Sequence, residues 1–116
     1  GVGHLPCRLR PAMKTHKKKR IEIIVELPVL RRVVEIIDET GSSGYSVLPM
    51  MAGRGMEGEW SRDAMIGDTG HMAMVSVVPS EHRLETLLER IYALVKRQVG
   101  IITVSDVEVI RAEHFS

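Results

Sequence analysis

The stretch RIEIIVELPVLRRVVEIIDETG, residues 20–41, decides how this chain folds. Its first part has the period of two expected of a strand with one buried face. The alternating positions are Ile21, Ile23, Val25 and Leu27 on one face and Glu22, Ile24 and Glu26 on the other. Pro28 stands where the first turn of a helix tolerates a missing amide, and apolar residues at helical spacing follow until Gly41. A strand therefore leads directly into a helix.

The rest of the chain continues this alternation of elements. After the turn GSSG at 41–44, the segment YSVLPMM at 45–51 predicts a second strand, in which Pro49 indicates a sheet edge or bulge. HMAMVSVV at 71–78 predicts a third strand. A helix capped by Ser80 and ending before Gly100 follows, and IITVSDVEVI at 101–110 predicts the last strand. This order is the α+β, ferredoxin-like βαββαβ sandwich, whose four-stranded antiparallel sheet carries two helices on one face. Ile24 with its charged neighbours on the other face favours an interface between subunits.

Between the second and third strands lies AGRGMEGEWSRDAMIGDTG, residues 52–70, for which no element is predicted. Long loops in compact domains are usually functional or disordered. The five glycines of this segment predict a mobile loop. Its large apolar residues, Trp60, Met65 and Ile66, either anchor a partner or fold back on the body of the domain, and both readings stay open.

Composition bounds the function. The 116 residues, 44% of them hydrophobic and 3% aromatic, suit one domain with an aliphatic core. A net charge of +1 predicts no strong nucleic-acid or membrane field. Cys7 is the single cysteine, so no internal disulfide forms and the cytoplasm is the simplest compartment. No apolar run reaches the roughly 18 residues of a membrane span.

Residues 1–19 are expected to form a flexible tail before the domain of residues 20–116. Within the tail, residues 1–12 are interpreted as an expression remnant that precedes a natural start at Met13. The basic run from Lys17 to Arg20 either contacts an anionic partner or, as the simpler interpretation, is a solvated charge run beside the first strand.

Several segments resemble one family. VVEIIDETGSSGYSV at 33–47 resembles the same region of the PII-like signalling proteins, especially their carboxysome- and bicarbonate-transporter-associated branch, the CPII and SbtB proteins. Gly-Arg-Gly at 53–55, VVP at 77–79 and GII at 100–102 are similar to that family in order and spacing. The resemblance runs from about Arg20 to Phe115.

The resemblance implies a homotrimer with adenine-nucleotide sites in the clefts between subunits. Glycine amides and arginine are suited to phosphate oxygens, although Gly53–Gly55 also reads as a simple hinge. The implied nucleotide-binding residues are Ser46 near the adenine, Val77 through its backbone, Gly53, Arg54 and Gly55 at the phosphates, Val99, Gly100 and Ile101 in a short loop, and Arg111 from the neighbouring subunit.

The chain departs from the nitrogen-sensing members in two ways. Those members carry a TGxxGDGK phosphate loop, where this chain has only KRQVGII at 96–102, so a triphosphate is expected to bind less well. Met56 and His71 stand where a glutamine and a lysine help to hold 2-oxoglutarate, so binding of that ligand is not expected.

The resemblance therefore implies a sensor rather than an enzyme. Its ligands would be ADP or AMP, with ATP and cyclic AMP as further candidates, and bicarbonate on Gly53–Gly55; no metal or cofactor is expected. It would regulate inorganic-carbon acquisition through the ordered loop, with a bicarbonate transporter or carboxysome-associated protein as partner. Two alternatives remain, a CutA-like trimeric metal-binding protein and a weak nucleotide hydrolase that uses the loop carboxylates Glu57, Glu59, Asp63 and Asp68.

Overall fold

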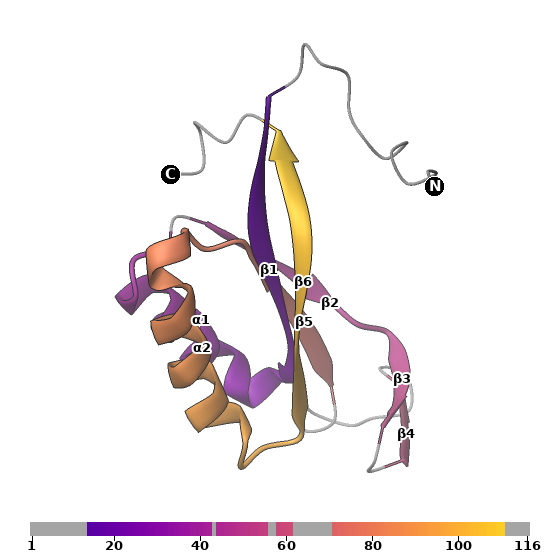
Figure 1. The fold of residues 1–116 in the computed structure, drawn as a ribbon. Helices are drawn as coiled ribbons and strands as arrows, with labels where there is room; N and C mark the ends of the chain where they lie inside the picture. The colour runs from indigo at the N-terminus through magenta and orange to yellow at the C-terminus, as the bar shows by residue number, and fades with distance from the viewer. Residues whose placement is uncertain (1–13, 43, 56–57, 62–70, 111–116) are drawn as a thin grey trace.

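The computed structural model describes residues 14–42, 44–55, 58–61 and 71–110 (Figure 1). Its elements, in chain order, are β1 (Thr15–Glu26), α1 (Leu27–Glu39), β2 (Tyr45–Pro49), β3 (Ala52–Gly55), β4 (Gly58–Ser61), β5 (Met72–Val77), α2 (Glu81–Val95) and β6 (Gly100–Ile110). The two helices and the four strands β1, β2, β5 and β6 confirm the predicted βαββαβ order. Ser80 precedes α2 as its N-cap residue, although its hydroxyl makes no capping hydrogen bond.

The main sheet has four strands in the order β2-β5-β1-β6, and each neighbouring pair is antiparallel. Both helices cover the same face of this sheet (Figure 1). This is the ferredoxin-like sandwich, in which β1 and β5 are central and β2 and β6 form the two edges.

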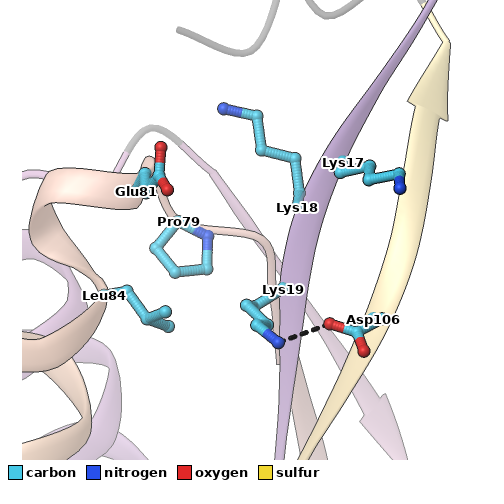
Figure 2. A pocket seen from close by; sticks show the side chains of 7 residues that line it. All are labelled: Lys17, Lys18, Lys19, Pro79, Glu81, Leu84 and Asp106. Carbon is cyan, nitrogen blue, oxygen red and sulfur yellow. Dashed lines mark hydrogen bonds and ion pairs between the residues drawn. The ribbon is translucent and has the colours of Figure 1, made fainter.

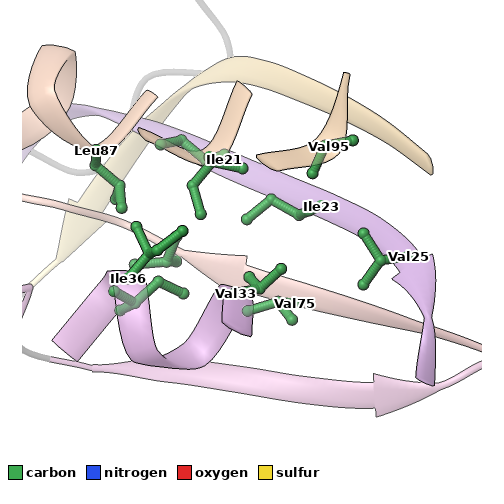
Figure 3. Close-up of a cluster of buried hydrophobic side chains, with 11 residues drawn as sticks. Ile21, Ile23, Val25, Val33, Ile36, Val75, Leu87 and Val95 are labelled. Atoms are coloured by element: carbon green, nitrogen blue, oxygen red, sulfur yellow. The ribbon is translucent and has the colours of Figure 1, made fainter. Parts of the chain in front are cut away.

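The core lies between the sheet and the helices (Figure 3). From β1 it receives the side chains of Ile21, Ile23 and Val25, all of which have no exposed surface. The helices bury one stripe each, Val33, Ile36 and Ile37 from α1 and Leu87, Ile91 and Val95 from α2. The period of two in the strand and the helical spacing in α1 and α2 therefore meet in one apolar layer.

β1 begins at Thr15, and this differs from the expected tail of residues 1–19. Its first residues pair with the end of β6, from Thr15 opposite Ile110 to Lys19 opposite Asp106. The basic run has no apolar alternation, so the sequence pattern alone shows no strand there. The strand forms because β6 continues to Ile110 and supplies the partner backbone.

Residues 52–55 and 58–61 also differ from expectation, because they form two paired strands, which we call the hairpin, rather than no element. β3 and β4 form a separate two-stranded sheet, with Ala52 opposite Ser61 and Gly55 opposite Gly58. Glycine has low strand propensity, so the sequence pattern of these residues does not predict strands. Pairing between the two neighbouring strands compensates for the weak propensity by satisfying their backbone groups.

Gly41 ends α1 in the left-handed region, with φ of 83°. The amide of Gly41 donates to the Asp38 carbonyl at 3.1 Å and that of Ser42 donates to Ile37 at 3.3 Å, the paired bonds of a Schellman motif. Arg83 of α2 occupies the space beside Gly41, where its Nη1 donates to the Thr40 carbonyl at 3.0 Å. The end of α1 is thus tied to the start of α2.

We expect Gly41→Ala to lower the free energy of unfolding by about 1–2 kcal/mol from left-handed strain alone. A Cβ there would also lie 1.5 Å from the Arg83 guanidinium and displace it. Urea unfolding at fixed protein concentration measures the change. Gly44→Ala is the matched control, since no atom lies within 4 Å of its Cβ position. Equal losses in the two variants would contradict this account.

Candidate functional site

The sheet face opposite the helices carries a polar row that includes a predicted site residue. Ser46 of β2 lies opposite Ser76, which lies opposite Glu22 of β1, and Glu22 lies opposite Thr103 of β6. Because Ile21 and Ile23 point to the helices, their neighbour Glu22 points to the other face. Ser46 is exposed at the β2 end of this row.

The neighbouring row on the same open face is apolar. It crosses all four strands in the order Leu48, Met74, Ile24 and Ile101. At its two ends, Leu48 is 44% and Ile101 is 53% exposed. We call these four residues the open-face row. A continuous apolar row on an uncovered sheet face is typical of an association surface.

Val77 lies at the end of β5, opposite Tyr45 of β2 and Ile21 of β1. Its side chain is 2% exposed and belongs to the core. A ligand can therefore reach Val77 only through its backbone, which is the role that the family resemblance implies. Tyr45 beside it is 41% exposed on the β2 edge.

Val99, Gly100 and Ile101 lie where the chain leaves α2 and enters β6. Gly100 faces Val25 at the end of β1, and a Cβ at Gly100 would lie 2.7 Å from the Ile24 carbonyl oxygen. The glycine is thus required by the close approach of β6 to β1, whatever it binds. Val99 and Ile101 beside it are exposed.

Two of the predicted binding residues, Ser46 and Gly100, lie at opposite edges of the sheet. Ser46 belongs to β2, which leads into the hairpin with Gly53–Gly55, whereas Gly100 begins β6 on the far edge. Three strand spacings separate the edges by roughly 14 Å, and the rows of Ser46 and Gly100 are also offset along the strands by roughly 10 Å. One chain does not bring the two groups together around one ligand.

Several predicted residues are placed only in part. The backbone of β3 sets Arg54 opposite Glu59 and Gly53 opposite Trp60. Trp60 therefore belongs to strand β4 of the hairpin. Outside the described residues lie Met56, Glu57, Asp63, Met65, Ile66, Asp68 and Arg111.

His71, at the position of the family lysine, has a structural contact through its backbone. Its carbonyl accepts a hydrogen bond of 2.9 Å from the amide of Leu27, at the junction of β1 and α1. Within the described part of the chain, no three His, Cys, Asp or Glu side chains are grouped to hold a metal ion. Nor does that part contain a helix long and apolar enough to cross a membrane.

Comparison with known families decides the assignment. Residues 18–114 match the model of the family described as nitrogen regulatory protein P-II. The chain belongs to the P-II family. No curated protein matches its sequence significantly.

Solved structures of P-II-like proteins share the fold. The chain is similar to CPII from Thiomonas intermedia bound to ADP, AMP and bicarbonate, with a TM-score of 0.81, 25% identity, and coverage of 90% of this chain and 98% of the other. For CPII bound to ADP and bicarbonate the TM-score is 0.77 at 25% identity, covering 90% and 100%. A putative PII-like signalling protein from Thermus thermophilus has a TM-score of 0.74 at 23% identity, covering 90% and 100%, and this likeness concerns the fold alone.

In this P-II chain, the sequence pattern assigned only Ile24 of the open-face row to the open face of the sheet. Leu48 and Met74 each occupy the alternate position of a predicted strand, so the period of two contained the signal. The pairing of strands was needed to show that they form a continuous row.

Proposed function

We propose that this P-II chain is a signalling protein that assembles as a homotrimer and binds ADP or AMP in the clefts between its subunits. The observation that carries the proposal is the separation of Ser46 and Gly100 onto the β2 and β6 edges of one sheet. A ligand contacts both groups only when the β2 edge of one subunit meets the β6 edge of another.

The open-face row supplies the reason for assembly. Leu48, Met74, Ile24 and Ile101 lose contact with water when the sheets of three subunits face inward. The polar row beside it provides groups that pair across the same interface. Burial of this face brings neighbouring edges together and so couples assembly to formation of the nucleotide site.

Each cleft would use both kinds of edge. One subunit contributes Ser46 and the Val77 backbone near the base, with Gly53, Arg54 and Gly55 at the phosphates. The neighbour contributes the short loop Val99–Ile101 and Arg111. Exposed Val99 and Ile101 provide apolar contact for the nucleotide, while the arginines supply charge-assisted hydrogen bonds to phosphate oxygens.

ADP and AMP are preferred over ATP in this proposal. The connection between α2 and β6 is short, KRQV at 96–99, and β6 begins directly after it with Gly100. It offers no glycine-rich turn with a lysine for a third phosphate. The similar CPII structures are described as bound to ADP, AMP and bicarbonate.

Bicarbonate is the proposed second ligand, held by Gly53–Gly55 beside the nucleotide phosphate. These residues form β3, and an ordered or displaced hairpin would change the surface presented to a partner. The proposed role is regulation of inorganic-carbon acquisition, with a bicarbonate transporter or carboxysome-associated protein as the target. The proposal includes no catalytic step.

Arg54→Ala should weaken ADP binding by about 1.5–3 kcal/mol, because it removes a charge-assisted phosphate contact. Isothermal titration calorimetry measures this change. Arg31→Ala is the control, since Arg31 is exposed on α1 and far along the chain from the predicted site residues. If both variants bind ADP like the original chain, the phosphate does not lie at Arg54.

ADP and bicarbonate should strengthen each other's binding by the same factor, because coupling between two sites is reciprocal. Titrating each ligand with and without the other measures this factor. Trp60 is the only tryptophan, so its emission reports on β4 during both titrations. Equal ADP affinity with and without bicarbonate would remove bicarbonate from the proposal and leave nucleotide binding intact.

A further inference from the structure

The first half of β1 has an open edge in the described part of the chain. β6 pairs with β1 from Thr15 to Val25, but β5 pairs only with Ile21–Glu26. β1 and β6 therefore project beyond the main sheet as a two-stranded ribbon (Figure 1). On the β5 side of Thr15–Arg20 no described strand follows, so the backbone groups along that edge are open to pairing with another chain.

The open edge exists because the chain turns away after Val77. Pro79 is buried just beyond β5, and α2 begins at Glu81, so the chain crosses to the helix layer. Proline cannot donate a ladder hydrogen bond, which prevents β5 from continuing beside β1. Among the described residues, none pairs with the β5 side of Thr15–Arg20.

A pocket of about 280 Å³ lies beside this edge. Its lining residues are Lys17, Lys18, Lys19, Pro79, Glu81, Leu84 and Asp106. Pro79 and Leu84 form its apolar part, from the start of the α2 layer (Figure 2). Figure 2 shows the Lys18 side chain extending from β1 on the side where Pro79 and Glu81 lie.

The charges of the pocket are unevenly paired. Lys19 forms an ion pair with Asp106 of β6, and their hydrogen bond and opposite charges lower the pKa of Asp106. Asp106 is therefore ionised at neutral pH and holds Lys19. Among the described residues, Lys17 and Lys18 have no ion pair. The Lys18 ammonium group thus remains for an anionic partner, whereas Lys17 lies opposite Glu108 of β6 and its charge also contributes to the lowered pKa of Asp106.

We infer that the Thr15–Arg20 edge and its pocket are a docking site for an extended acidic peptide segment of a partner protein, which adds to β1 as a strand. Backbone hydrogen bonds to the edge would supply affinity, and alternate side chains would meet the pocket. An acidic side chain matches Lys18, whereas an apolar side chain on the alternate face matches Pro79 and Leu84.

A second copy of this chain fits the edge less well. Two such edges placed side by side would bring two lysine-rich segments together, and lysine on an edge strand opposes that pairing. The site also shares none of its lining residues with the proposed nucleotide site, so either proposal can fail alone.

The test uses a fluorescein-labelled synthetic peptide of about eight residues that alternates glutamate and valine, long enough to span the edge. Fluorescence anisotropy should show saturable binding that weakens as salt is raised. The Lys17→Glu/Lys18→Glu double variant should bind at least about tenfold more weakly, because charge-assisted contacts are lost. An Arg31→Glu/Arg97→Glu variant carries the same change of net charge away from the pocket and should retain the original affinity.

A second peptide separates strand addition from charge attraction. It keeps every glutamate but replaces alternate valines by proline, which removes backbone donors, and it should bind at least about tenfold more weakly. Equal binding of the two peptides overturns strand addition. No binding of the first peptide, or equal binding by both double variants, overturns the docking site. Thermal unfolding of the Lys17→Glu/Lys18→Glu variant at an unchanged midpoint shows that the comparison concerns folded protein.

Discussion

Ile24→Arg is expected to convert the proposed homotrimer into a monomer and to abolish the proposed ADP binding. Ile24 lies in the middle of the open-face row, between Met74 of β5 and Ile101 of β6. Burying a guanidinium there would cost several kcal/mol of association free energy per subunit, because desolvation of the charge is not fully repaid even beside Glu22 and Glu26. Because the proposed nucleotide site spans two subunits, loss of assembly removes the site as well.

Light scattering measures the mass of this variant, and calorimetry at the same concentration measures its ADP binding. Tyr92→Arg is the control. Tyr92 is 61% exposed on α2, on the helix layer rather than the open face, so arginine there should leave both the mass and the binding unchanged. An Ile24→Arg trimer that binds ADP normally would show that the subunits associate through another surface.

Gly100→Val is expected to lower the free energy of unfolding by roughly 3 kcal/mol, the upper part of the range for overpacking. The added Cβ would lie 2.7 Å from the Ile24 carbonyl oxygen, 3.1 Å from a Val95 methyl and 3.2 Å from a Val25 methyl. The nearest atom belongs to the backbone of a central strand, so it cannot move aside like the end of a flexible side chain. The start of β6 must shift away from β1 instead.

Urea unfolding in the absence of nucleotide isolates this packing effect from any role in ligand binding. Gly100→Ala should show the same direction with a smaller loss, and Gly44→Ala should show almost none because its Cβ position is open. If Gly100→Val unfolds at the same urea concentration as the original chain, the close approach of β6 to β1 is not required for stability. The motif GII would then be explained by ligand binding alone.

Local patterns were sufficient for most of the fold. The alternation around Ile23 and the helical stripe that includes Ile37 both indicate burial on one face, and each period can be recognised from nearby residues along the chain. The stop at Gly41 was also readable, since a residue just after a helix often needs the left-handed conformation.

Two strand segments could not be predicted from local sequence patterns. Lys17–Lys19 have no apolar alternation, and their strand depends on β6 residues that are distant in the sequence. β3 contains Gly53 and Gly55, so it has no alternation of apolar and polar side chains. In both segments the backbone pairing, rather than side-chain burial, determines the structure.

For the candidate site, the sequence by itself determined which residues carry suitable chemistry: glycines and an arginine at 53–55, and a short turn at Gly100. Only the tertiary structure decided where they lie. The strand order β2-β5-β1-β6 places Ser46 and Gly100 on opposite edges, and the same order aligns Ile24 with apolar residues of the other three strands. Strand order is set by contacts between segments far apart in the chain, which no local pattern of residues encodes.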